Sequence, residues 1–101
     1  MVHVLAFIQV KAGKKADFIR IFKANIPQVL AEHGCIEYVP TIDVETGLPP
    51  QDLDSNNVTI IEKWESLEAL KKHLTAPHML AYRKQVKDIV EKSSFKVLTP
   101  A

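Results

Sequence analysis

Side chains that can move protons or pack against a flat molecule are concentrated between Trp64 and Tyr82. His73 is the strongest candidate for a general base, because an imidazole titrates near neutral pH. His78 and Tyr82 are four residues apart, so on one helix they would face the same side. Tyr38, earlier in the chain, adds a phenol that could hold a ligand oxygen. Together these residues offer general acid–base chemistry, provided that the fold gathers them around one pocket.

Each of these side chains also has a purely structural interpretation. His73 could bond a backbone carbonyl and fix its helix, and Trp64 could be a core residue with a satisfied indole N–H. His73 and His78 are five residues apart with Pro77 between them, and no CxxC or HxxxH spacing occurs, so the sequence predicts no metal site. It also contains no glycine-rich phosphate loop and no nucleophile elbow.

The totals indicate one globular domain spanning residues 1–101 with a balanced surface. Hydrophobic residues make up 47% of the 101 residues, enough for a core, and the formal net charge is +1. This balance predicts neither a nucleic-acid partner nor a membrane partner. The N-terminal segment lacks the features of a secretory signal, and the single Cys35 suits a reducing compartment. We therefore expect a cytoplasmic protein.

The elements that must position these side chains follow from hydrophobic periodicity. Residues 3–10 predict a strand that is apolar on both faces, and residues 14–33 a helix that Pro27 kinks or divides. Residues 35–44 predict a second strand, in which Pro40 marks an edge or a bulge. Residues 45–57 have the composition of a mobile surface loop. The inward stripe of the first helix is expected to comprise Phe18, Phe22, Ile26, Val29 and Leu30, with Ile21 alongside.

The second half of the chain predicts two more strands and a pair of helices. Residues 58–65 form a strand, and Ser66 then caps a short helix that ends at Leu74. A further helix runs from Pro77 to about Lys92, and residues 94–98 form the last strand. The inward residues are expected to be Leu67, Leu70 and Leu74 on the short helix, and Leu80, Val86, Ile89 and Val90 on the longer one.

This order predicts an α+β, ferredoxin-like sandwich: an antiparallel sheet with helices on one face. The first strand nevertheless carries Leu5 and Phe7 on the face that the helices leave bare. Because large exposed apolar faces are uncommon in monomers, we expect a homodimer that forms through the sheet faces.

The central segment resembles the antibiotic biosynthesis monooxygenase family, which includes quinol monooxygenases. The matching residues are Glu62-Lys-Trp64-Glu-Ser66-Leu-Glu-Ala-Leu-Lys-Lys-His73-Leu-Thr-Ala-Pro77-His78, and Gly34-Cys35-Ile36-Glu37-Tyr38 is also similar. The resemblance implies a dimeric α/β barrel with a pocket in each subunit. It further implies oxidation of a quinol or another phenolic molecule by O2, without a cofactor.

On this resemblance His73 is the catalytic base, and the residues expected around the small aromatic substrate are Tyr38, Trp64, His78, Met79 and Tyr82. A haem-degrading branch of the family uses an Asn, a Trp and a His. Those positions fall near Ala6, His73 and Arg83, so we expect no haem turnover.

The alternative function is a non-catalytic dimeric α/β-barrel domain that binds a small apolar ligand. A mixed polar and aromatic pocket at His73 would favour the enzyme. A filled core there would favour the alternative.

Overall fold

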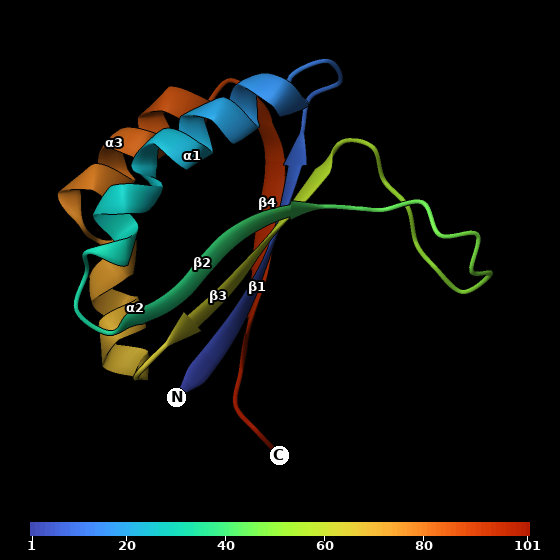
Figure 1. Cartoon of the computed structure of the whole chain (residues 1–101). Helices are drawn as coiled ribbons and strands as arrows, with labels where there is room; N and C mark the ends of the chain where they lie inside the picture. Colours follow the sequence, from blue (N-terminus) through green and yellow to red (C-terminus); the bar gives the residue numbers. More distant parts are fainter.

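The computed structural model describes all 101 residues and confirms the expected order of elements. The strands form one four-stranded sheet. Figure 1 shows the helices gathered on one side of this sheet. The elements are β1 (Val2–Val10), α1 (Lys15–Leu30), β2 (Cys35–Ile42), β3 (Asn57–Trp64), α2 (Leu67–Leu74), α3 (Pro77–Val86) and β4 (Val90–Leu98).

The sheet has the strand order β2-β3-β1-β4, and each neighbouring pair is antiparallel. The ferredoxin-like α+β prediction is therefore confirmed. β1 lies inside the sheet, where Leu5 pairs with Ile61 of β3 and with Lys96 of β4. β2 is an edge strand, as Pro40 indicated, since a proline cannot donate a ladder hydrogen bond.

Two predicted boundaries in the last third of the chain are wrong. α3 ends at Val86 rather than near Lys92, and β4 begins at Val90 rather than at Ser94. Val90 pairs with Val10, and the carbonyl of Ile89 accepts a hydrogen bond from the Lys11 N–H at 2.8 Å. Residues 86, 89 and 90 have the spacing of one helical face, but the same apolar residues are compatible with a turn followed by a strand. Pairing with β1 favours the strand over a continued helix.

Three leucines that the helical pattern placed inward are half-exposed instead. Leu30, Leu67 and Leu80 retain 51%, 46% and 50% of their accessible surface. On α3 the buried residues are Met79, Tyr82 and Val86, of which Val86 was in the expected inward set. α1 continues through Pro27 as one helix to Leu30, so of the two expected effects of Pro27, a kink or a division, the division is wrong. None of the three helices has the length and hydropathy that crossing a membrane requires.

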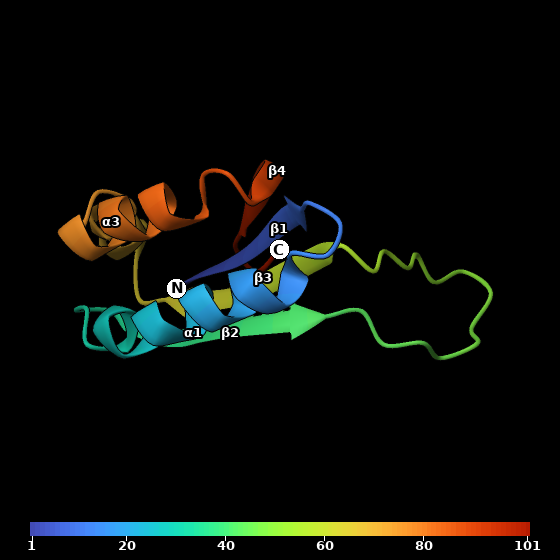
Figure 2. The ribbon, with the colours of Figure 1, turned by 90° about the horizontal axis from the view of Figure 1, so that it is seen from above.

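Residues 43–56 form an arm that projects beyond the ends of β2 and β3, well away from the helices (Figures 1 and 2). The predicted second strand therefore ends at Ile42, two residues early. The arm has local polar bonds of its own, such as the one from the Asp54 N–H to the Asp43 carboxylate at 2.8 Å. Val44, Leu48 and Leu53 are exposed along it.

Candidate active site

A cavity of about 360 Å³ lies between the helices and the inner face of the sheet. The sheet contributes Val4, Ala6, Ile8, Ile60 and Glu62, and the helices contribute Phe22, Leu70, His73, Met79 and Tyr82. Tyr38 and Arg83 also line it, and Phe95 of β4 lines its outer part, where that strand extends past the helices. The lining is therefore mainly aliphatic and aromatic, with a smaller number of polar and charged groups.

The structure brings four of the predicted site residues to this cavity. His73, Tyr38, Met79 and Tyr82 all line it. Trp64 does not line it, because its indole is fully buried behind His73, with 4.6 Å between the two ring centres. His78 lies in a separate groove between α1 and α3.

The N-cap of α2 and a hydrogen bond to Glu32 hold His73 in place. The Ser66 hydroxyl accepts a hydrogen bond from the Ala69 N–H at 3.1 Å, which confirms the predicted N-cap. Nδ1 of His73 lies 2.8 Å from Oε2 of Glu32, a residue just beyond the end of α1. A carboxylate only accepts hydrogen bonds, so Nδ1 must donate, and Nε2 then carries the lone pair.

Nε2 of His73 is the atom positioned to accept a proton from a ligand. It has no hydrogen-bond partner in the protein, and every fully buried side-chain N or O has one, so Nε2 is not fully buried. His73 lines the cavity, where a ligand could meet this atom. Burial lowers the pKa of His73, and this effect outweighs the opposing influence of Glu32. The imidazole is consequently neutral, and able to act as a base, at neutral pH.

Glu62 is the site residue to which the sequence analysis assigned no role. It is buried in the cavity wall, and its Oε1 accepts a hydrogen bond from Nε1 of Trp64 at 3.0 Å. Burial raises the pKa of Glu62 from 4.5 to about 6; the Trp64 bond opposes this rise and the charge of Glu32 adds to it. The signal in the sequence was the i, i+2 spacing of Glu62 and Trp64 on one strand, which places both side chains on the same face.

Two phenols and a phenylalanine form the aromatic wall of the cavity. The rings of Phe22 and Tyr38 stack at 5.0 Å, and Tyr82 meets Phe22 edge-on at 5.9 Å. Burial is the main cause that raises the pKa of both tyrosines, so each remains a protonated donor at neutral pH. A ring-shaped ligand would therefore find stacking surfaces and hydroxyl donors next to two bases.

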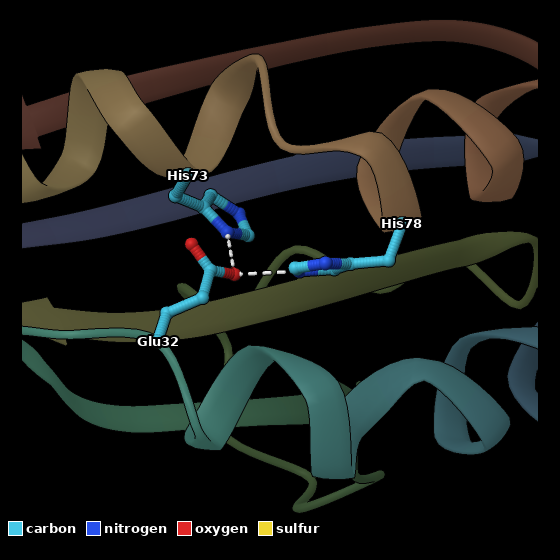
Figure 3. Close-up of side chains that lie close together, drawn as sticks. All are labelled: Glu32, His73 and His78. Atoms are coloured by element: carbon cyan, nitrogen blue, oxygen red, sulfur yellow. Dashed lines mark hydrogen bonds and ion pairs between the residues drawn. The ribbon is translucent and has the colours of Figure 1, made fainter.

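Glu32 connects His73 to His78, although the three residues come from three different segments of the helical layer. Figure 3 shows both imidazoles reaching the same carboxylate oxygen, and each of the two distances is 2.8 Å. The three candidate donor atoms lie within 4.8 Å of one another. The spacing of residues in the sequence predicted no metal site. It could not reveal this cluster, because Glu32 is 41 residues away from His73.

Comparisons with known proteins agree with the fold. A family model described as antibiotic biosynthesis monooxygenase matches residues 1–85. The chain is 34% identical over 102 residues to the "Probable quinol monooxygenase YgiN" of Escherichia coli K12, covering 99% of this chain and 98% of that protein. Among solved structures, Rv0793 from Mycobacterium tuberculosis has a TM-score of 0.81 at 26% identity, covering 99% of this chain and 94% of the other. PA3566 from Pseudomonas aeruginosa has a TM-score of 0.82 at 22% identity, with 99% and 93% covered.

Proposed function

The chain belongs to the antibiotic biosynthesis monooxygenase family, and on that premise we propose that it oxidises a quinol or a related phenol with O2. The observation that carries this proposal is the cavity itself, which is lined by a neutral imidazole, His73, and by the buried carboxyl group of Glu62. A cavity of about 360 Å³ suits a ligand of one or two fused rings. The electrons for oxygen reduction would come from the substrate.

The reaction requires an electron-rich form of the substrate. His73 would take one hydroxyl proton through Nε2, because a phenolate gives up electrons to oxygen more readily than a phenol does. A second hydroxyl proton would pass to Glu62. Overall, one quinol and one O2 give one hydroxyquinone and one water. Tyr38 and Tyr82 would donate hydrogen bonds to the substrate oxygens, and the apolar walls would keep bulk water from the intermediate.

The ligand-binding alternative is less well supported. A filled core around His73 would have favoured it, whereas a cavity lies there and two groups able to accept protons line it. A passive apolar site also has no need of a buried carboxyl group whose pKa is raised to about 6. We therefore give the oxygenase proposal priority.

Oxygen uptake with a panel of quinols tests the proposal. His73→Gln keeps a hydrogen-bonding side chain but removes the base, so turnover should fall roughly 10²-fold or more. His33→Gln is the matched control, because His33 is an exposed histidine of the same chain, with 95% of its side chain accessible. Full turnover in His73→Gln would exclude His73 as the base. Absence of oxygen uptake by the wild type with every quinol would overturn the proposed function.

We also propose that two copies pair through the outer face of the sheet. Leu5, Val39 and Ile61 are adjacent there, since Ile61 pairs with Leu5 on one side and with Val39 on the other, and Phe7 is next to them on β1. Val39 and Ile61 keep 41% and 38% of their surface in the single chain. A second copy would cover this apolar patch.

Sedimentation tests the pairing. Phe7→Glu would place a charge in the interface, so the dimer should dissociate at micromolar concentrations. Leu80→Glu introduces the same charge on the outer side of α3, where Leu80 is half-exposed, and should leave the dimer intact. A monomeric wild type would exclude the pairing without bearing on the cavity chemistry.

A further inference from the structure

Glu32, His73 and His78 form a second centre that the proposed oxidation does not require in full. Glu32 and His73 meet behind the cavity, on the side of the imidazole opposite Nε2, and His78 lies outside the cavity altogether. No Lys or Arg forms an ion pair with Glu32, and its only charge partners are the two imidazoles. Only 14% of the Glu32 side chain is accessible, so this negative charge is largely withdrawn from water without a permanent cation beside it.

The ligand atoms of the three side chains indicate which cation could neutralise the charge of Glu32. Two imidazole nitrogens and one carboxylate oxygen are the protein ligands of many open zinc sites, in which a water takes the fourth position. Calcium and magnesium prefer oxygen ligands throughout and would not select two imidazoles. We propose that Glu32, His73 and His78 bind one divalent ion of the zinc class, through Oε2, Nδ1 and Nε2 respectively.

The three donor atoms would have to shift to admit the ion. Oε2 of Glu32 is 2.8 Å from each imidazole nitrogen, and all three atoms lie within 4.8 Å of one another, while donors around a tetrahedral zinc ion are about 3.4 Å apart, given bonds of about 2.1 Å. Glu32 would make part of this shift, since its side chain is partly accessible. Each imidazole would stay neutral by carrying its single proton on the other ring nitrogen, Nε2 of His73 and Nδ1 of His78, so that the nitrogen facing Glu32 is free to bind the ion. Nε2 of His73 could then not act as a base, so an ion-bound chain would not carry out the proposed oxidation.

An ion can reach the centre without crossing the cavity. His78 lines a groove that also contains Asn25, Gln28 and Gln85, and 17% of its side chain is accessible. The fourth ligand would be a water on this side. Because the three ligands come from the α1–β2 turn, α2 and α3, a bound ion would join three segments of the helical layer and stabilise their packing.

Calorimetric titration of metal-free protein with Zn²⁺ at pH 7.5, without substrate, is the first test. The wild type should bind one ion per chain, and its Tm should rise with the Zn²⁺ concentration. Mg²⁺ and Ca²⁺ should leave Tm unchanged. Titration with Co²⁺ should give the absorption bands of a four- or five-coordinate ion, which weak surface binding would not produce.

Variants assign the ligands. Glu32→Gln and His78→Ala should each weaken Zn²⁺ binding by at least about 10-fold, since even partners that only orient a metal ligand cost that much. His33→Ala is the matched control: His33 also faces a carboxylate, with Nε2 3.9 Å from Oε2 of Glu65, but both side chains are exposed. Melting curves without metal establish that each variant is folded.

The proposal fails if the wild type shows no saturable Zn²⁺ binding, or if Glu32→Gln and His78→Ala bind as tightly as the wild type. Loss of binding in His33→Ala alone would assign the ion to the surface pair and would also overturn it. These outcomes are independent of the quinol reaction, because no substrate is present.

Discussion

Glu32 and Glu62 are two carboxyl groups withdrawn from water in the same small protein, and their partners differ. Glu32 accepts hydrogen bonds from two imidazoles at 2.8 Å each. Glu62 accepts one from a neutral indole at 3.0 Å, and burial raises its pKa to about 6. The first carboxylate is tied into the helical layer by its partners. Glu62 is buried in the cavity wall, although its ionised form would be more stable in water. Carboxyl groups with a pKa raised in this way are common at active sites.

Removing Glu32 should destabilise the folded protein, whereas neutralising Glu62 should stabilise it. The largest effect should come from Glu32. Glu32→Ala leaves the N–H groups of His73 and His78 without their acceptor. A hydrogen bond to a charged group contributes about 1.5–3 kcal/mol, so the loss should be roughly 3 kcal/mol or more. For a domain of this size that lowers Tm by more than about 10 °C.

Thermal melting of metal-free protein at pH 7.5 measures this loss. Glu91→Ala, on the exposed side of β4, removes a carboxylate of the same type and should change Tm by very little. Equal melting of the two variants would show that Glu32 contributes no more than a surface residue.

Glu62→Gln should stabilise the protein at pH 7.5, by up to about 2 kcal/mol. Because the folded-state pKa of Glu62 is raised from 4.5 to about 6, its contribution to stability is fully present below pH 4.5 and is lost as the pH rises through about 6. Glutamine has no proton to lose and can still accept the Trp64 N–H. The gain should therefore vanish at pH 4.5.

Urea unfolding of wild type and Glu62→Gln at both pH values provides the measurement. A gain of the same size at pH 4.5 would mean that the effect does not arise from ionisation. Oxygen uptake by the same variant should fall. A more stable but less active variant would show that the ionised Glu62 promotes the reaction although it destabilises the folded protein.

The smallest effect concerns the pKa of Glu62 itself. Trp64→Phe removes the N–H that favours the ionised carboxylate, so the pKa should rise above about 6, by roughly one unit for the loss of one hydrogen bond. A carbon-detected NMR titration of the carboxyl group measures this value. An unchanged or lower pKa would show that water replaces the indole, and that the cavity wall is less dry than the structure indicates.

The sequence by itself determined the order of elements and the ferredoxin-like fold, because period-2 and period-3.6 patterns report local geometry directly. Ser66 was identifiable as a helix cap and Pro40 as an edge residue for the same reason: each effect acts within a few residues. His73, Tyr38, Met79 and Tyr82 were also chosen from sequence, through the family resemblance, and they line one cavity.

Only the tertiary structure decided what those residues touch. Glu32 and His73 are 41 residues apart, and the turn after α1 brings them together when α1 packs against the sheet and α3, so no sequence period could reveal the pair. Leu30, Leu67 and Leu80 turned outward because each helix is oriented by its packing partners, and an apolar stripe wider than the contact leaves its margin in solvent. The role of Glu62 likewise depends on burial, and burial belongs to the folded chain rather than to any segment of it.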